Sequence, residues 1–402
     1  MVKLDRVLRR DGIEPAAAVE LLVELIALQS VNPPGDEALV AEYVSELLAP
    51  LDVRPDVMTI ADGRANVTAV LPGRGRVPRL MLNAHLDVVP PGERAWRTPP
   101  FAPIVRDGRV YGRGSADMKA GLAAMLIALG TLARRPRALD GDLVFAGVAD
   151  EEHAGLGSQH LLDDGFLDGV GGIVFGEPTG LELYIAEKGA LCVELTTHGR
   201  AAHAGMPHLG INAIEPMLAI LDRARRLPVD GPRHPLLGAP TVTIGTIRGG
   251  VKSNVVPDAC HATLDIRTLP GASHRAIVDS LEMLIAEAGG GSATAPTLRV
   301  LADRPGVATD PDAALVRATH QILSTERGRP IALAGTPGYV TDASVLVPGT
   351  GLPFVIFGPG APEMAHQVDE CVEISDYLVA ARLYAAAAEH YFVHLEREVS
   401  RS

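Results

Sequence analysis

Short apolar segments that end in histidine or acidic residues recur along this chain, and they constrain its fold more than any other feature. Four predicted strands carry such residues beyond their carboxyl ends: 80–82 with His85 and Asp87, 143–148 with Glu151 and Glu152, 173–175 with Glu177, and 354–357 with His366. Segments with helical periodicity, such as 15–29 and 38–48, alternate with the strands. This alternation predicts an α/β fold with a mostly parallel sheet flanked by helices, in which ligands bind beyond the carboxyl ends of the strands.

The first of these segments suggests a metal ligand together with its partner. His85 and Asp87 are two residues apart in an extended segment, so their side chains point to the same side. The carboxylate can therefore approach one imidazole nitrogen while the other nitrogen is left for a metal. Asp117 stands just before the Ala-rich segment 120–133, which predicts a helix. Each residue alone has an ordinary alternative: a hydrogen-bonded histidine at a strand end and an acid that caps a helix.

The side chains at these strand ends predict a site for two metal ions. Two histidines and several carboxylates, without cysteine, suit Zn²⁺, with Co²⁺ or Mn²⁺ as alternatives. They offer enough ligands for two ions if one carboxylate bridges them, and Asp117 is central in the chain order. Glu151 and Glu152 are adjacent at a strand end and point apart, so one can bind metal while the other takes the proton of a water. If the acids are solvated turn residues and His366 is a surface histidine, no such site forms.

A change of pattern between residues 187 and 297 predicts a second domain. This segment reads as strand, helix, two strands and helix, and it ends in the glycine-rich stretch 289–296. The strands alternate and the helices are amphipathic, which indicates a small α+β sandwich inserted into the larger domain. We therefore expect a catalytic domain formed by residues 1–186 and 298–402, and an inserted domain formed by residues 187–297.

The composition disfavours several kinds of partner. The formal net charge of -13 disfavours nucleic acid, because phosphate binding needs clustered lysine and arginine. No apolar run approaches the length of about 18 residues that a membrane span needs, and the first residues lack the apolar core of a signal peptide. The three cysteines lie far apart without CxxC spacing, which is typical of reduced thiols. We expect a cytoplasmic protein that binds neither nucleic acid nor membrane.

An ordered set of motifs resembles one known family over nearly the whole chain. The motifs are HLDVVPPG, GRGSADMKAG, DEEHAGLGS, GEPTG, GRAAHAGMPHLGINAI, GGVKSNVVPDA, DIRT and GPGAPEMAHQVDE. None of them is decisive alone, but their order is specific. Together they resemble the zinc metallopeptidase family of acetylornithine deacetylase, succinyl-diaminopimelate desuccinylase, the aminoacylases and glutamate carboxypeptidase.

The resemblance implies roles for the residues at the strand ends. Each of two zinc ions would have three protein ligands, one of them shared: His85, Asp117 and Glu177 for one ion, and Asp117, Glu152 and His366 for the other. Asp87 would orient His85, Glu151 would be the general base, and the peptide bond after Asp117 would be cis. The inserted domain would serve as a lid and a dimer interface, so we expect two Zn²⁺ per subunit and a homodimer.

The resemblance also implies substrate contacts in the inserted domain. His203 matches the family's oxyanion-stabilising histidine, which reaches the zinc site of the partner subunit. Asn254 and Arg267 match positions that grip a substrate carboxylate, the arginine by a bidentate pair. Two alternatives stay open from the residues themselves: His203 can be an ordinary turn histidine, and Arg267 can pair with Asp265 on the same predicted strand.

The chain departs from the family pattern at residues 338–342. Many amino-acid deacylases carry a loop like GGTSDA there, whereas this chain reads TPGYVTDAS. Tyr339 and Val340 are bulkier than the expected glycine and threonine, which alters the pocket for the acyl group or the amino-acid side chain. Tyr339 and Thr341 are the substrate-binding candidates of this loop, and simple packing is the alternative for Tyr339.

These observations predict a metal-dependent hydrolase that cleaves the amide bond of a small N-acyl amino acid with a free carboxylate, using a water activated between two zinc ions. One alternative is a dipeptidase or carboxypeptidase of the same family, which acts on a peptide. Another is a catalytically silent metal-binding sensor protein. The presence of Glu151 beside Glu152 counts against the sensor, which would not need a second carboxylate for proton transfer.

Overall fold

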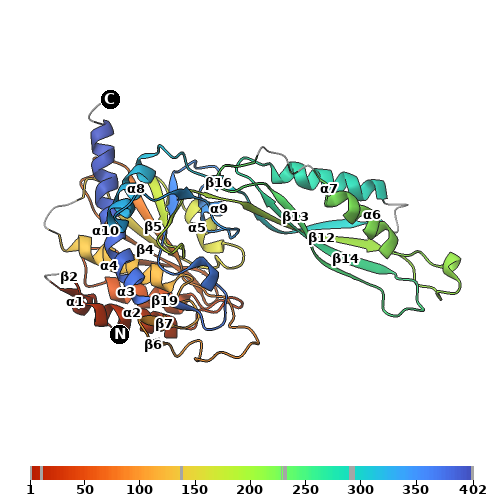
Figure 1. Cartoon of the computed structure of the whole chain (residues 1–402), viewed down its shortest axis with the longest axis horizontal. Helices are drawn as coiled ribbons and strands as arrows, with labels where there is room; N and C mark the ends of the chain where they lie inside the picture. Colours follow the sequence, from red (N-terminus) through yellow and green to blue (C-terminus); the bar gives the residue numbers. More distant parts are fainter. Residues whose placement is uncertain are drawn as a thin grey trace. The chain divides into compact units, whose positions relative to one another are not determined.

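Two units make up the chain, and each contains a sheet of its own (Figure 1). Unit 1 comprises Met1–Ile185, Ala308–Pro337 and Thr341–Ser402, and unit 2 comprises Ala186–Val307 and Gly338–Val340. The computed structural model describes residues 2–9, 12–135, 139–227, 229, 233–288 and 295–399. Within these residues, no helix combines the length and the apolar character that crossing a membrane requires.

Unit 1 is built around an eight-stranded sheet in the order β17-β10-β18-β9-β5-β8-β4-β3. Its four central strands run parallel: β18 (Phe354–Ile356), β9 (Val170–Phe175), β5 (Arg79–His85) and β8 (Leu143–Val148). The flanking strands are β10 (Leu183–Tyr184), β17 (Leu333–Ala334), β4 (Arg64–Leu71) and β3 (Asp56–Ala61). Antiparallel pairs join β10 to β18, β4 to β8, and β3 to β4. The predicted α/β fold with a mostly parallel sheet is confirmed.

Helix α4 (Lys119–Ala133) shows how the sequence fixes the packing of unit 1. Its Ala-rich sequence is apolar on all sides, and nearly all of its residues are buried, as expected for an enclosed helix. It lies against β5 and β8 and packs on α10 (Ile374–Val399). Gly121 permits this close approach, because a Cβ there would collide with the carbonyl oxygen of Gly176, just beyond β9. The helix therefore begins next to the carboxyl ends of the central strands.

The other elements of unit 1 are shorter or lie around this core. The helices are α1 (Leu4–Val7), α2 (Pro15–Ala27), α3 (Ala38–Leu48), α5 (Leu156–Asp163), α8 (Ala314–Arg327), α9 (Ala343–Leu346) and the 3-10 helix η2 (Pro362–Met364). A three-stranded sheet contains β19 (Cys371–Glu373), β7 (Arg109–Tyr111) and β6 (Ile104–Arg106), and a two-stranded sheet contains β1 (Leu8–Arg9) and β2 (Gly12–Ile13). Helix α3 spans the predicted residues 38–48, and α2 ends two residues before the predicted limit of 29.

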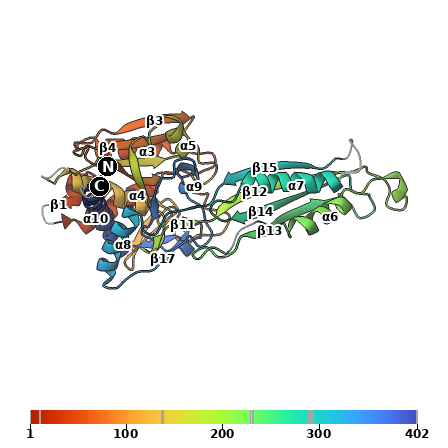
Figure 2. The ribbon, with the colours of Figure 1, turned by 90° about the horizontal axis from the view of Figure 1, so that it is seen from above.

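Unit 2 is an antiparallel sheet covered by two helices (Figure 2). The strands follow the order β13 (Thr241–Gly249), β14 (Ala259–Thr268), β12 (Gly189–His198) and β15 (Thr297–Arg304), and the helices are α6 (Ile214–Ala224) and α7 (His274–Ala288). Alternate residues of β12, including Leu191 and Val193, are buried with Met217 of α6 and Leu281 of α7. This is the predicted α+β sandwich. The remaining elements are β11 (Ala186–Glu187), η1 (Pro207–Leu209) and β16 (Val307–Ala308), of which Ala308 already belongs to unit 1.

The limits of unit 2 differ from the expected domain limits. The sequence pattern ends the inserted domain at residue 297, but β15 begins there and pairs with β12, so it completes the sheet of unit 2. This partnership depends on backbone hydrogen bonds between segments about 100 residues apart, which alternation within one strand does not reveal. Residues 338–340 also belong to unit 2. Of the expected glycine-rich exit, 289–294 lies outside the described residues.

Candidate metal centre

The carboxyl ends of the central strands of unit 1 bring the five predicted ligands together. His85 is the last residue of β5, Glu152 follows β8, Glu177 follows β9, and His366 follows β18 beyond η2. Asp117 lies just before α4, whose N-cap residue is Met118, and within the described residues no side-chain cap hydrogen bond is made there. The alternative of a helix cap therefore does not hold for Asp117, whose carboxylate faces two histidines.

Asp117 stands between the two imidazoles. Its Oδ1 atom is 3.0 Å from Nε2 of His85, and its Oδ2 atom is 3.3 Å from Nε2 of His366. Each carboxylate oxygen thus faces a different histidine, which is the arrangement that a carboxylate shared between two ions requires. The peptide bond between Asp117 and Met118 is cis, as the resemblance implies.

A further carboxylate lies beside each histidine. Oε2 of Glu177 is 3.8 Å from Nε2 of His85, and Oε2 of Glu152 is 3.0 Å from Nε2 of His366. The contacts therefore divide into two groups that share Asp117. One donor atom each from His85, Asp117 and Glu152 lies within 4.8 Å of the other two, so the two groups form one cluster.

The buried carboxylates of this cluster repel one another, and this repulsion favours a cation. Burial raises the pKa of Glu177 and of Glu151 well above the ordinary value, and neighbouring carboxylates raise it further against the opposing effect of His85. Burial lowers the pKa of His85, but the surrounding carboxylates outweigh it and hold that pKa well above 6.5. Hydrogen bonds to two carboxylates raise the pKa of His366 to about 10. Imidazole and carboxylate donors in this density fit a divalent metal such as zinc.

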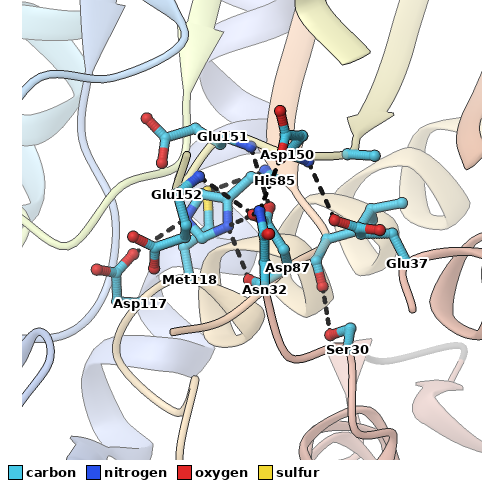
Figure 3. A network of polar contacts seen from close by, with 12 residues as sticks. Ser30, Asn32, Glu37, His85, Asp87, Asp117, Met118, Asp150, Glu151 and Glu152 are labelled. Carbon is cyan, nitrogen blue, oxygen red and sulfur yellow. Dashed lines mark hydrogen bonds and ion pairs between the residues drawn. The ribbon is translucent and has the colours of Figure 1, made fainter. Parts of the chain in front are cut away.

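Asp87 is fully buried next to His85 and links it to the loop after β8. Nδ1 of His85 lies 3.0 Å from the backbone carbonyl oxygen of Asp87 and 3.6 Å from its Oδ1 atom. The carboxylate of Asp87 accepts hydrogen bonds of 3.3 and 3.1 Å from the backbone amides of Glu151 and Glu152 (Figure 3). The closer contact with the imidazole is therefore made by the carbonyl group, and the carboxylate holds the adjacent loop.

Glu151 and Glu152 turn their side chains in different directions, as the sequence predicts. In Figure 3, Glu152 points towards Asp117, whereas the carboxylate of Glu151 lies apart from both. Glu151 is nevertheless buried, with 9% of its surface exposed. The carboxylate of Glu152 therefore lies among the candidate ligands, and that of Glu151 lies beside them.

Glu370 is a residue of this site that sequence reasoning missed. Its fully buried carboxylate accepts hydrogen bonds of 2.6 to 3.0 Å from one guanidinium and three backbone amides, those of Arg113, Gly114, Ala116 and Asp117. Burial raises its pKa to about 7. Glu370 therefore fixes the loop that presents Asp117. The motif AHQVDE places it four residues after His366, but this spacing does not distinguish a buried acid from a solvated one.

His203 and Asn254 lie side by side on unit 2. His203 pairs with Val255 in an isolated antiparallel bridge, and the amide of Ala204 donates a 2.9 Å hydrogen bond to the carbonyl oxygen of Asn254. Both candidate side chains are exposed. Nδ1 of His203 accepts a 3.0 Å hydrogen bond from the amide of Gly205, so the ring has a preferred orientation.

Arg267 is paired with a neighbour on its own strand. Its Nε and Nη2 atoms donate to the two carboxylate oxygens of Asp265 at 2.7 and 3.0 Å, and Nη1 donates to the carbonyl oxygen of Gly338 at 3.0 Å. The structural alternative for Arg267 is therefore present. Tyr339 follows Gly338 and is half-buried. Thr341 belongs to unit 1, where it is fully buried and its Oγ1 atom accepts a 3.1 Å backbone hydrogen bond at the start of α9.

The sequence of the chain matches a known family. Residues 81–390 match the model of peptidase family M20/M25/M40. The chain belongs to this family. It is 32% identical over 397 residues to a succinyl-diaminopimelate desuccinylase of Methylobacterium radiotolerans, and the match covers 95% of this chain and 98% of that protein. Membership of the M20/M25/M40 family and this relative indicate a hydrolytic enzyme that acts on amide bonds.

Two solved structures of M20 proteins share the fold of this chain. A metallo-carboxypeptidase of Sulfolobus solfataricus aligns with a TM-score of 0.80 at 19% identity, covering 94% of this chain and 99% of that one. A dinuclear metal binding peptidase of Bacillus subtilis aligns with a TM-score of 0.71 at 17% identity, covering 95% and 98%. At these identities the likeness concerns the fold alone. The cluster around Asp117 is the candidate metal centre of this M20/M25/M40 protein.

Proposed function

We propose that the protein is a two-zinc amidohydrolase that removes an acyl group from the amino nitrogen of a small amino acid with a free carboxylate. The observation that carries this proposal is the place of Asp117, which directs one oxygen to His85 and the other to His366. The ligands of the two ions would be His85, Asp117 and Glu177, and Asp117, Glu152 and His366. The ions, when bound, would supply a Lewis acid for the amide carbonyl and for the attacking water, with Co²⁺ or Mn²⁺ as replacements for Zn²⁺.

The residues around the ligands divide the remaining work. Glu151 accepts the proton of the attacking water and passes it to the leaving amine, a role that needs a carboxylate beside the ligands and not among them. Asp87 holds Nδ1 of His85, so that Nε2 faces the cluster. His203 of the partner subunit donates a hydrogen bond to the oxyanion that develops on the acyl carbon.

Unit 2 supplies most of the remaining contacts in this proposal and acts as a lid and as the interface of a cytoplasmic homodimer. Its Asn254 and Arg267 bind the carboxylate of the substrate. Tyr339 of unit 2 and Thr341 of unit 1 are the further substrate-binding residues. Asp265 and the carbonyl of Gly338 use one N–H each of Nε, Nη2 and Nη1 of Arg267, so the substrate carboxylate would meet the second N–H groups of Nη1 and Nη2. The name of the relative from Methylobacterium radiotolerans supports an acylated amino acid as the class of substrate.

A substrate panel separates this function from its rivals. The zinc-loaded protein is to be assayed against N-acetyl and N-succinyl amino acids and against unmodified dipeptides. Preferred hydrolysis of the acylated amino acids supports the proposal. Preferred hydrolysis of dipeptides indicates a dipeptidase or carboxypeptidase, and metal binding without turnover of any compound indicates a sensor.

The adjacent pair Glu151 and Glu152 gives the sharpest test of mechanism. Glu151→Gln should retain both ions and lose turnover by about 10²–10⁴-fold, since it removes only the proton acceptor. Glu152→Gln, the same change one residue later, should lower the bound zinc measured by atomic emission. Full turnover in Glu151→Gln would refute the assigned role of Glu151.

A further inference from the structure

The turn SVNPPGDE, at residues 30–37 between α2 and α3, turns all of its polar side chains except that of Asp36 inward. Ser30 and Glu37 are fully buried and Asn32 is 3% exposed, although a turn rich in proline and polar residues is expected on the surface. The proposed function uses none of these residues. Their burial therefore needs a separate explanation.

Asn32 connects two acidic residues that flank the candidate metal centre. Its Nδ2 atom donates hydrogen bonds of 2.8 Å to Oδ2 of Asp87 and 2.9 Å to Oδ1 of Asp150 (Figure 3). Its Oδ1 atom accepts a 2.8 Å hydrogen bond from Nη2 of Arg64. Because a guanidinium only donates and a carboxylate only accepts, these three contacts fix which way the amide points.

Both acidic partners of Asn32 hold the loop that follows β8. Asp87 accepts the backbone amides of Glu151 and Glu152, and Asp150 accepts those of Ala154 and Leu156 at 3.2 and 3.4 Å. Asp150 itself has a left-handed backbone conformation with a φ of 67°, which is uncommon for a residue other than glycine. The conformation of this loop therefore depends on how the carboxylates of Asp87 and Asp150 are oriented. Both of them accept hydrogen bonds from the side-chain amide of Asn32.

Arg64 holds the turn in place against β4. Its Nη1 atom donates to Oε1 of Glu37 at 2.8 Å and to Oδ1 of Asp150 at 2.7 Å, and Nη2 also donates to the carbonyl oxygen of Pro34 at 2.7 Å. The turn passes so closely that a Cβ at Gly35 would collide with the guanidinium group. Gly35 also has a φ of +99°, which favours glycine. These contacts leave the amide of Asn32 little freedom to move.

We propose that Asn32 is a positioning residue of the metal centre. Through the carboxylates of Asp87 and Asp150 it fixes the loop that carries Glu151 and Glu152, and it orients the Asp87 carboxylate that lies 3.6 Å from Nδ1 of His85. It thereby sets metal affinity and turnover without touching metal or substrate. This inference rests on the proposed function, because it assigns the braced residues to metal binding and proton transfer.

Cobalt binding tests this role independently of catalysis. Co²⁺ is titrated into the metal-free 402-residue chain and into its variants Asn32→Ala and Asn32→Asp, and the affinity and the visible absorption band are recorded. We expect the affinity to fall by about tenfold in Asn32→Ala, the lower end of the range for residues that support a ligand. Asn32→Asp should fall further, because it places a third carboxylate against Asp87 and Asp150. In the metal-saturated variants, kcat should fall while KM stays unchanged.

A matched control separates positioning from general support of the turn. Ser30→Ala removes a buried 2.6 Å hydrogen bond from the same turn to the carbonyl oxygen of Leu86. It should lower the melting temperature and leave the cobalt affinity and band unchanged. In addition, Asn32→Ala in an Asp87→Ala background should cause a smaller loss of affinity than in the unchanged protein, because the two residues act through one contact.

The outcomes distinguish this inference from the proposed function. If the unchanged protein binds Co²⁺ and hydrolyses substrate, and Asn32→Ala matches it in affinity, band and kcat, the positioning role is wrong while the function stands. If the unchanged protein binds no Co²⁺, the proposed function fails and this inference fails with it. If Asn32→Ala does not fold, the same cobalt titration is made on Arg64→Lys. This change keeps the positive charge but removes the guanidinium group that donates hydrogen bonds to both Asn32 and Asp150.

Discussion

The candidate metal centre of unit 1 and the candidate substrate contacts of unit 2 are built in opposite ways. In unit 1, His85 and Asp87 are buried and contact groups from distant parts of the chain: Asp117 lies against His85, and Asp87 binds Asn32 and the amide of Glu151. In unit 2, His203 and Asn254 are exposed, and the His203 ring accepts a hydrogen bond from an amide two residues away. Buried and cross-linked ligands are fixed before anything binds, whereas exposed side chains gain their partners on binding. Packing within unit 1 therefore prearranges the candidate ligand His85 and its neighbour Asp87, whereas the candidate substrate contacts His203 and Asn254 acquire partners only on binding.

The largest effect is expected from removing the metal from the candidate metal centre of unit 1. Dialysis against a chelator should abolish hydrolysis and lower the melting temperature, because an ion that binds only the folded state stabilises it. Added Zn²⁺ should restore both, as measured by product formation and thermal unfolding. Undiminished hydrolysis by protein whose metal content is shown to be negligible would contradict the metal centre.

A substitution in the exposed half should reduce turnover without affecting the metal. His203→Ala should lower kcat by about 10²–10³-fold, as loss of one oxyanion donor does, with the bound zinc unchanged. His208→Ala, an exposed histidine of η1 in the same unit, is the matched control and should keep full turnover. Equal losses in the two variants would remove the special role of His203.

A substitution at Glu370 tests the support of the shared ligand. Glu370→Gln presents an amide donor to backbone amides that need an acceptor, so the loop before Asp117 should shift. Metal affinity should fall by about 10–100-fold in a competition titration. Glu373→Gln, three residues later, breaks only an exposed ion pair with Arg109 and should leave the affinity unchanged. A normal affinity in Glu370→Gln would show that Asp117 is held by other contacts.

The smallest expected effect is a pH-dependent change in stability caused by Glu37, in the turn at residues 30–37. Burial, and then the charge of Asp87, raises the pKa of Glu37 from 4.5 to about 7, against the opposing charge of Arg64. Within the described residues its Oε2 atom has no hydrogen-bond partner, and its Oε1 atom accepts from Arg64 and from the amide of Asp150. A raised pKa means that the protonated form contributes stability, which is fully present below 4.5 and is lost as the pH rises through about 7.

Glu37→Gln stays neutral at every pH and therefore isolates this titration. Relative to the unchanged protein, its melting temperature should rise as the pH increases from about 5 to about 8. Thermal unfolding of the metal-loaded proteins at steps of pH measures the difference. A difference that is constant over this range would mean that Glu37 has the same pKa in the folded and unfolded chain.

The contrast between the two units also explains what sequence reasoning achieved. The strand ends at His85, Glu152, Glu177 and His366 were predictable, because each is a local pattern of apolar residues followed by a ligand type. The edge strand β15 was predicted to belong to the catalytic domain, but it completes the sheet of unit 2. Its partner β12 is remote in sequence, so the pairing could not be predicted from a local pattern. Glu370 and Asn32 escaped notice for a related reason: their neighbours come from other loops, and burial of a polar residue leaves no local signal.

The sequence by itself determined the alternation of strands and helices, the α/β class, the inserted sandwich and the set of residues from which a metal centre can be built. Each of these follows from periodicity and residue type within short segments. The tertiary structure alone decided that the oxygens of Asp117 face different histidines, that the carbonyl of Asp87 meets His85, and that a proline-rich turn reaches the loop after β8. Such contacts join segments far apart in the chain, and their geometry is set by the packing of the whole sheet and its helices.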